Sequence, residues 1–213
     1  MGAEQYEGYD RISAVLGYFY LPDMVKRIGK VGMKEWKRSG TVAMKFGTEV
    51  DEWIKAHVTG GKLPKIKSDE VQNCVNAYLL WEKEYGYKVE VGKRVFNETQ
   101  KVTGEPDLLT SSTVIDVKCS IVIRPQYWMQ TEWYGRQTGK VCKAILRLDK
   151  HLGVYEYQEK NLDLSCYDAV NGLIEAYKWF NITQESLTES EENDDVTDTN
   201  STDTEAGSEK DLA

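Results

Sequence analysis

The sequence predicts an α/β domain in which a mixed central β-sheet is flanked by helices. The hydrophobic pattern has a helical period up to about residue 85 and then changes to strand-like alternation. The predicted elements run in the order of helices, three strands, a helix, two strands and a helix. Within GEPDLLTSSTVIDVKC, residues 104–119, a short polar turn joins two half-apolar runs, which is the pattern of a β-hairpin.

The first part of the chain is predicted to be helical. Residues 11–20 form a short helix, and residues 22–38 form an amphipathic and basic helix with a proline near its first turn. Residues 41–58 place apolar side chains at helical spacing, so they form the next helix. Residues 68–85 begin with a Ser-Asp capping signal and form another helix.

The second part of the chain mixes strands and helices. Residues 87–96 alternate as a strand, and residues 101–109 and 113–119 form the two strands of the hairpin. Residues 125–137 read as a helix that a proline opens. The remaining elements are strands over 141–148 and 152–158 and a helix over 161–180.

The amino-acid composition limits the classes of protein to which the chain can belong. The chain has 213 residues, which suffice for one domain with a sizeable core. Its four cysteines, at positions 74, 119, 142 and 166, form no CxxC pair; this favours reduced thiols and argues against a zinc site or an iron–sulfur cluster. The N-terminal residues lack the features of a secretory signal, and no apolar run is long enough to cross a bilayer. We therefore expect a cytoplasmic protein without membrane association.

The negative charge is concentrated at the C-terminus. Residues 185–213 contain eleven acidic residues and one lysine, so the net charge of −8 leaves +2 for residues 1–184. Because this segment has few apolar side chains to bury, we expect residues 184–213 to be a disordered acidic tail and residues 1–183 to be the domain. The tail either solubilises the protein, or mimics nucleic acid and competes for a basic groove, or docks a partner.

The predicted hairpin brings together residues with catalytic potential. Asp116 and Lys118 are two positions apart, so they lie on the same face of a strand. Asp107 ends the preceding run, and the hairpin brings it near Asp116. Two carboxylates on adjacent strands attract a hard divalent cation such as Mg²⁺ or Mn²⁺. A neighbouring lysine can orient a water or stabilise charge on a phosphate, although a surface hairpin with incidental charges fits these three residues equally well.

These residues, G-x-P-D followed by I-D-x-K, resemble the PD-(D/E)xK nuclease superfamily, and especially its RecB-like and phage-type exonucleases. Three further segments of the chain are similar to motifs of that family and occur in the same order. They are RISAVL at residues 11–16, FGTEVDEWI at residues 46–54, and Gln130 to Tyr134, which matches a Q-x-x-x-Y helix. The resemblance covers residues 11–160 and implies a restriction-endonuclease-like core.

The resemblance also implies roles for individual residues. One or two Mg²⁺ or Mn²⁺ ions would be held by Asp51, Asp107, Asp116 and the Val117 carbonyl. The chain departs from the RecB-like pattern at Asp51, where histidine is usual; this change favours Mg²⁺. Lys118 would orient the attacking water, and the family's helix motif implies that Gln130 and Tyr134 position Lys118 and the DNA backbone. The four-cysteine cluster of some relatives is absent, so no iron–sulfur cluster is expected.

Several residues are candidates for contact with DNA. By resemblance the Ser13 hydroxyl meets a substrate phosphate, and Arg11 lies in the same motif. Lys34 and Lys37 belong to a basic helix face that either follows phosphates or is simply solvated. Tyr127 and Trp128 are candidates for stacking on an unpaired base, although most tryptophans of the chain are expected in the core.

The predicted function is that of a metal-dependent DNA exonuclease that leaves 5′-phosphates. Its substrate would be linear double- or single-stranded DNA, in recombination, repair or replication, and a phage origin fits the small size. Partners compatible with this role are a single-strand-annealing, helicase or recombination protein, or further copies of the chain. Two alternatives stay open: a structure-specific or restriction-like endonuclease, and a catalytically silent nuclease fold that binds DNA.

Overall fold

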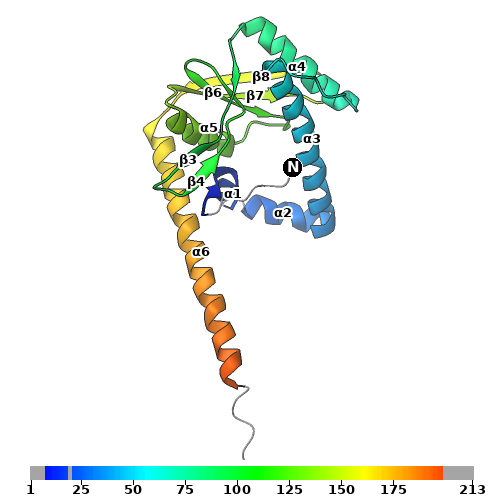
Figure 1. The fold of residues 1–213 in the computed structure, drawn as a ribbon. Helices are drawn as coiled ribbons and strands as arrows, with labels where there is room; N and C mark the ends of the chain where they lie inside the picture. Colours follow the sequence, from blue (N-terminus) through cyan, green and yellow to red (C-terminus); the bar gives the residue numbers. More distant parts are fainter. Residues whose placement is uncertain (1–7, 19–20, 199–213) are drawn as a thin grey trace, which may run out of the picture. The chain divides into compact units, whose positions relative to one another are not determined.

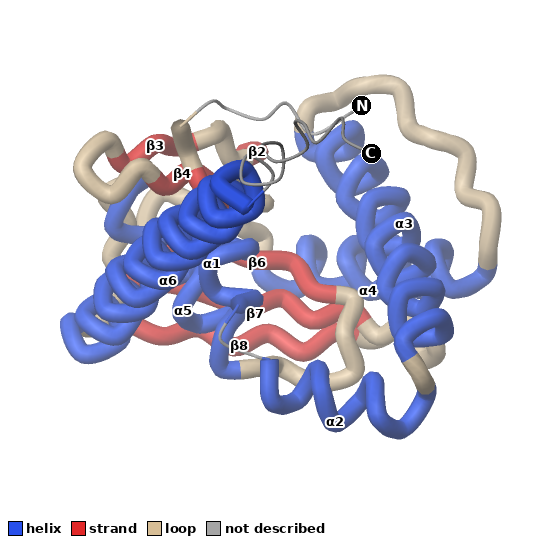
Figure 2. The backbone as a smooth tube through the Cα atoms, turned by 90° about the horizontal axis from the view of Figure 1, so that it is seen from below, coloured by secondary structure: helices blue, strands red, loops and turns tan. Residues whose placement is uncertain are grey.

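The computed structural model describes residues 8–18 and 21–198, with the backbone alone for residues 21–24, 27 and 182–198. The chain divides into two compact units, residues 1–174 and residues 175–213, which are described separately. The first unit contains both β-sheets and the candidate site. The backbone course is drawn in Figure 1 and, from below, in Figure 2.

The larger sheet of the first unit has five strands in the order β2-β5-β6-β7-β8. Only β6 and β7 of this sheet pair in parallel; the other neighbours are antiparallel. The β5–β6 pair, with Leu108 opposite Ile115, confirms the predicted hairpin. The strand bounds are β2 Glu90–Val91, β5 Leu108–Leu109, β6 Thr113–Lys118, β7 Cys142–Leu148 and β8 Tyr155–Asn161.

A smaller sheet of three strands lies beside the first. Its order is β1-β4-β3, with β1 parallel to β4 and β3 antiparallel to it. The β4 strand is fully buried, because α1 packs against it and against α5. The bounds are β1 Asp10–Arg11, β3 Val95–Asn97, β4 Val102–Gly104 and α1 Ile12–Tyr18.

Helices cover both faces of the five-stranded sheet. α3 (Met33–Val58) and α4 (Asp69–Tyr85) form the main core with one face, to which Ile115 and Leu146 contribute. α5 (Pro125–Thr138) packs on the other face, where Lys143 of β7 meets its Glu132. Figure 2 shows α3 and α4 together, apart from α5. The side chains of β6 therefore alternate between the core of α3 and α4 and the layer of α5.

One helix boundary and two strands differ from the prediction. The expected helix over 22–38 ends early: α2 covers Leu21–Val31, and α3 begins at Met33 and runs unbroken to Val58. The break falls at Gly32, whose φ of 80° few other residues adopt readily, and not between 38 and 41. The predicted strand over 87–96 is divided between β2 and β3, and the predicted strand over 101–109 is divided between β4 and β5. In both cases the two parts belong to different sheets.

The last helix, α6, runs from Leu164 to Asp198. It therefore continues through the first part of the segment for which we predicted disorder, and residues 199–213 lie outside the described residues. In the second unit, Trp179 and Phe180 form an edge-on ring contact with centroids 5.3 Å apart. The division into a domain of residues 1–183 and a tail of residues 184–213 stays a prediction.

The observed architecture confirms the predicted fold class. Mixed sheets are flanked by helices. The order of elements differs from the prediction in that β1 precedes α1, and β2 to β6 stand where three strands were expected between α4 and α5. Of the helices in residues 8–18 and 21–198, none has the length and apolar composition that crossing a bilayer requires.

Candidate active site

The β5–β6 hairpin positions the first three predicted site residues. Asp107 lies directly before β5, and Asp116 and Lys118 lie near the end of β6. Asp116 is 1% exposed, and its strand face is the one turned towards α5. Asp116 and Lys118 share this face, as the spacing predicted.

Lys118 forms a close ion pair with Asp116. Its Nζ donates a hydrogen bond to Asp116 Oδ1 at 2.7 Å and lies 2.6 Å from Oδ2. Burial lowers the pKa of Lys118, but the charges of Asp116 and Asp107 outweigh it, so the pKa is raised above its ordinary value. Lys118 is therefore an ammonium at neutral pH. It can donate hydrogen bonds and stabilise negative charge, but it cannot serve as a general base.

Asp107 is held by the backbone of the adjacent strand. Its Oδ2 accepts a hydrogen bond from the Val117 N–H at 2.7 Å, and its carbonyl accepts one from the Gly92 N–H. Burial and the neighbouring Asp116 carboxylate raise the pKa of Asp107 to about 7. Gly92 approaches this turn closely, since a Cβ there would lie 2.1 Å from the Pro106 carbonyl oxygen.

α3 brings a third carboxylate to the site. Asp51 Oδ2 lies 3.0 Å from Lys55 Nζ, one helical turn further on. The same ammonium lies 3.0 Å from Glu105 Oε1, and Glu105 in turn pairs with Arg94. Partial burial lowers the pKa of Lys55, but Asp51 and Glu105 raise it overall. Lys55 thus ties α3 to the turn that carries Asp107.

The site opens into a large cavity of about 1030 Å³. One wall is a face of α3 from Glu35 to Asp51, and the other is the end of β6 with the segment that leads into α5. Asp51, Asp107 and Lys118 all line this cavity, and the charge of Asp51 also acts on Asp107. Carboxylates from a helix and a turn and an ammonium from a strand therefore converge on one space.

The predicted Q-x-x-x-Y helix is α5. Gln130 Nε2 donates to Tyr134 Oη at 3.0 Å, so these two side chains hold each other. Burial raises the pKa of Tyr134 to about 12, and Tyr134 lies close enough to Lys118 for the two charges to interact. A Cβ at Gly104 would lie 2.5 Å from the Tyr134 ring, so the ring packs directly on β4. The positioning roles of Gln130 and Tyr134 stay predictions.

The residues at the site fit a hard divalent cation. Asp51, Asp107 and Asp116 offer carboxylate oxygens, the donor type that Mg²⁺ and Mn²⁺ prefer, but these oxygens do not all lie within 4.8 Å of one another. Among the described residues, Asp116 Oδ2 is buried without a hydrogen-bond donor, although it faces the Lys118 ammonium. Such an oxygen has capacity for a further partner. The ligand set Asp51, Asp107, Asp116 and the Val117 carbonyl stays a prediction.

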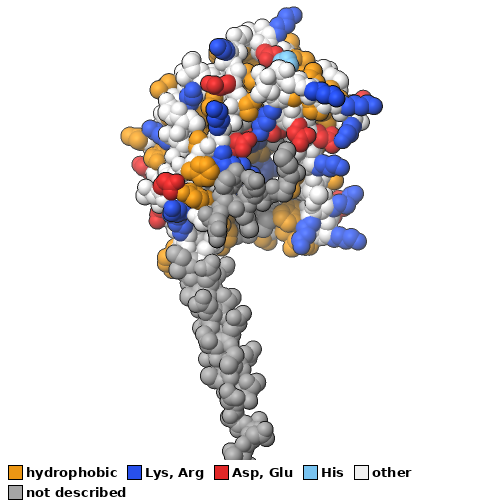
Figure 3. All heavy atoms as spheres, in the orientation of Figure 1, with side chains coloured by type: hydrophobic (Ala, Val, Ile, Leu, Met, Phe, Trp, Pro, Cys, Tyr) orange, Lys and Arg blue, Asp and Glu red, His pale blue; other side chains and the backbone are white. Residues whose placement is uncertain are grey.

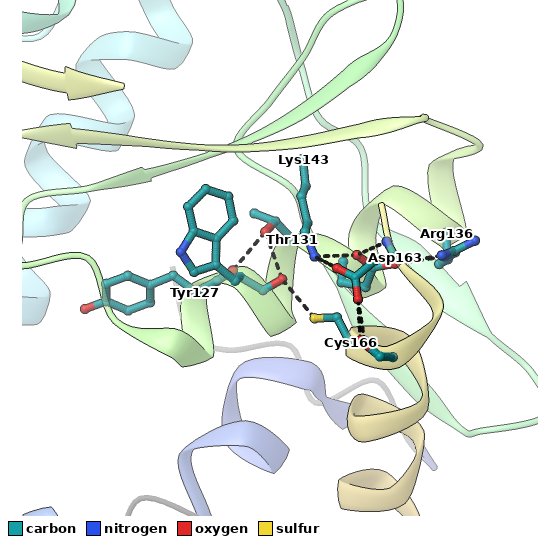
Figure 4. Close-up of polar contacts among 9 residues, drawn as sticks. Tyr127, Thr131, Arg136, Lys143, Asp163 and Cys166 are labelled. Carbon is teal, nitrogen blue, oxygen red and sulfur yellow. Dashed lines mark hydrogen bonds and ion pairs between the residues drawn. The ribbon is translucent and has the colours of Figure 1, made fainter. Parts of the chain in front are cut away.

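A second acidic group lies elsewhere, where α5, β7 and the start of α6 meet. Glu132, Asp163 and Cys166 bring potential metal-ligating atoms within 4.8 Å of one another. The Lys143 ammonium already forms ion pairs with two of these residues, because its Nζ lies 2.6 Å from Glu132 and 3.0 Å from Asp163 (Figure 4). Arg136 pairs with the other oxygen of Glu132. Because a metal would have to displace a buried ammonium, this group suits a structural ion pair.

The predicted DNA contacts are more scattered. Arg11 at the end of β1 and Ser13 in α1 are exposed, and neither lines the cavity. Lys34 and Lys37 are exposed on α3. In Figure 3, Lys and Arg side chains gather on the right-hand side of the molecule, where Figure 1 shows α3. Trp128 lies outside the cavity lining, and the ammonium of Lys160 lies 4.1 Å above its ring. Contact of these residues with DNA stays a prediction.

One residue beside the site, Lys55, escaped the sequence analysis, and another, Tyr127, was predicted there only to stack on an unpaired base. Lys55 follows Asp51 by four positions, a spacing typical of helical ion pairs that could have identified it. Tyr127 precedes Gln130 by three positions and Tyr134 by seven, which places all three on one side of a helix. Tyr127 lines the cavity, whereas its neighbour Trp128 does not.

Comparison with solved structures identifies the type of fold. The chain resembles the alkaline exonuclease LHK-Exo from Laribacter hongkongensis, with a TM-score of 0.51, 15% identity, and coverage of 87% of this chain and 94% of that one. At this identity the likeness concerns the fold alone. The chain thus has the fold of an alkaline exonuclease.

Two further solved structures match at lower scores. LHK-Exo in complex with dAMP has a TM-score of 0.49 and 17% identity, covering 69% of this chain and 85% of that one. A phage-related exonuclease from Haemophilus somnus has a TM-score of 0.42 and 16% identity, covering 66% and 82%. No model of a protein family matches the chain, and neither does any curated protein sequence.

Proposed function

We propose that this protein is a Mg²⁺- or Mn²⁺-dependent deoxyribonuclease that degrades DNA from an end and leaves 5′-phosphates. The observation that carries the proposal is the convergence of Asp51, Asp107 and Lys118 on one cavity, with Asp116 buried directly behind Lys118. The fold shared with an alkaline exonuclease supports it. Action from an end, and use in recombination, repair or replication, rest on the sequence resemblance.

The reaction is the hydrolysis of a phosphodiester bond. A water oxygen bonds to phosphorus, the bond from phosphorus to the 3′-oxygen breaks, and that oxygen leaves with a proton as a hydroxyl. A divalent ion held by Asp51, Asp107, Asp116 and the Val117 carbonyl would supply Lewis-acid stabilisation of the phosphate charge.

The residues of the chain contribute binding and electrostatics. Lys118 stays protonated, so its N–H groups can orient the attacking water and stabilise the charge that develops on the phosphate. Asp116 fixes the position of this ammonium through two short contacts. Asp107 must be ionised to serve as a ligand, and its pKa of about 7 places that change near neutral pH.

The test uses purified protein with linear and closed circular DNA, in Mg²⁺, Mn²⁺ or EDTA. Wild type should degrade linear DNA only with metal, and Lys118→Ala should lower the rate at least ~100-fold. Lys83→Ala is the matched control, because Lys83 is exposed on α4, outside the cavity. End-group analysis of the products should find 5′-phosphates.

Other outcomes would replace the proposal. Equal cutting of the closed circle would identify an endonuclease that uses the same site. If wild type bound DNA without degrading it in either metal, the protein would be a DNA-binding protein on a nuclease fold. Activity that survives Lys118→Ala would exclude the role of Lys118.

A further inference from the structure

Tyr127 is an aromatic wall of the candidate site. It lies in the first turn of α5, two residues after Pro125, and lines the same cavity as Asp107 and Lys118. The Lys118 Nζ lies 5.2 Å from the centroid of its ring, which is cation–π distance. Figure 4 shows the Tyr127 ring pointing away from the buried group around Lys143.

The two partners of Lys118 differ in kind. Asp116 is a carboxylate, whose oxygens would also bind a divalent cation in the proposed function. The ring of Tyr127 is neutral and attracts an ammonium through its quadrupole. A metal ion would compete with Lys118 for the Asp116 carboxylate but not for the neutral ring. If a divalent cation bound Asp116, the ring would still hold the Lys118 ammonium at the cavity wall.

The other polar residues of this α5 face are engaged elsewhere. Gln130 donates its hydrogen bond to Tyr134 at 3.0 Å, whereas Tyr127 contacts Lys118 directly. Tyr127 itself is anchored by its backbone, because its carbonyl accepts a hydrogen bond from Thr131 Oγ1 and its N–H donates to the Arg124 carbonyl. The ring is thus carried by a fixed turn.

We infer that Tyr127 is a positioning residue, which orients the Lys118 ammonium in the reaction through its ring face. The inference rests on the proposed nuclease function. The aromatic ring of Tyr127, and not its hydroxyl, orients the Lys118 ammonium. This orientation affects the rate of the reaction step and not the binding of DNA.

The test compares kcat and KM of Tyr127→Leu, Tyr127→Phe and wild type on linear DNA. We expect Tyr127→Leu to lower kcat about 10-fold, in line with the strength of a partly buried cation–π contact, and to change KM less than ~2-fold. Tyr127→Phe keeps the ring, so its kcat should stay within ~2-fold of wild type. Thermal melting verifies that each variant is folded.

Tyr167→Leu is the matched control. The Arg136 guanidinium lies over the Tyr167 ring at the same 5.2 Å, and neither residue lines the cavity. Loss of a cation–π contact in general would therefore affect this variant equally. We expect its kcat to equal that of wild type.

Three results would overturn the inference. They are a raised KM with unchanged kcat in Tyr127→Leu, an equal loss in Tyr127→Phe, and an equal loss in Tyr167→Leu. If wild type hydrolyses no DNA, the proposed function fails, and NMR of the metal-free protein tests the contact alone. The Lys118 side-chain methylene protons should then carry an upfield ring-current shift in wild type and Tyr127→Phe. That shift should vanish in Tyr127→Leu; its absence in wild type would refute the contact.

Discussion

Asp107, a predicted metal ligand, has a carboxyl group that is less acidic than usual. Folding raises its pKa from about 3.8 to about 7, because burial and Asp116 disfavour its charge. The folded state therefore binds the proton more tightly than the unfolded chain does. The stability that this group contributes is present in full below about pH 4 and is lost as the pH rises through about 7.

This shift predicts the pH dependence of stability without metal. Between pH 5 and pH 8 in EDTA, the free energy of unfolding of wild type should fall by about 2 kcal/mol relative to Asp107→Asn, which cannot ionise. Urea denaturation at several pH values measures both. Mg²⁺ added at pH 8 should restore stability in wild type more than in the variant. Parallel pH profiles of the two proteins would contradict the assignment.

At the residue scale, the sequence was a good guide to the acids and a poor guide to their partners. Asp107, Asp116 and Lys118 were predictable because a strand alternates its side chains and a hairpin pairs its ends. Lys55 was not singled out, although its spacing from Asp51 could have identified it. Tyr127 was predicted only to stack on an unpaired base, because its contact with Lys118 crosses from α5 to β6. The bond from the Val117 N–H to Asp107 likewise depends on how the turn before β5 folds back on β6.

At the scale of elements, a buried ion pair joins three parts of the first unit. Lys143 of β7 is 2% exposed and pairs with Glu132 of α5 and with Asp163 before α6 (Figure 4). Removing one partner of such a pair leaves an uncompensated charge in the interior. The pair therefore makes the packing of these elements depend on a single side chain.

Lys143→Met should lower the free energy of unfolding by roughly 3–5 kcal/mol, since the buried Glu132 would lose its closest cation and keep only Arg136 and the Asp163 N–H as partners. Lys140→Met is the control, because Lys140 bonds only backbone carbonyls at the surface, and it should cost less than about 1 kcal/mol. Urea denaturation measures both. Adding Glu132→Gln to Lys143→Met should recover part of the loss. Equal costs for the two lysines would refute this role.

Element types were predictable, whereas two boundaries were not. The capping serine of α4 and the proline that opens α5 mark helix starts by local chemistry, and both helices begin where expected. The break at Gly32 depends on a left-handed backbone angle that the pattern does not reveal, while Gly40 is simply absorbed into α3. The division of residues 87–96 between two sheets depends on long-range pairing.

At the scale of the molecule, charge is unevenly distributed along the chain. The net charge is −8, but residues 185–213 account for −10, which leaves the remainder slightly basic. Exposed lysines on α3 lie near the cavity that α3 lines. A protein that binds DNA through such residues releases counterions, so its affinity falls with salt.

If Lys34 and Lys37 each contact a phosphate, replacing either by alanine should make the slope of log affinity against log salt shallower by about 0.7–0.9. The binding assay uses the Lys118→Ala background to prevent degradation, with fluorescence anisotropy at several salt concentrations. Lys83→Ala in that background should leave the slope unchanged. An unchanged slope in the Lys34→Ala/Lys37→Ala double variant would remove both residues from the DNA interface.

The three acids of the site each have an internal partner: Lys55 for Asp51, the Val117 N–H for Asp107, and Lys118 for Asp116. In small zinc domains the ion provides the folding energy, and a chelator unfolds the chain. Here each acid has a partner within the chain, although burial still raises the pKa of Asp107 and Asp116. We expect the protein to fold without a divalent ion, and an ion at Asp107 to add stability above about pH 7. The concentration of divalent ions would then determine when the protein is active, and not whether it folds.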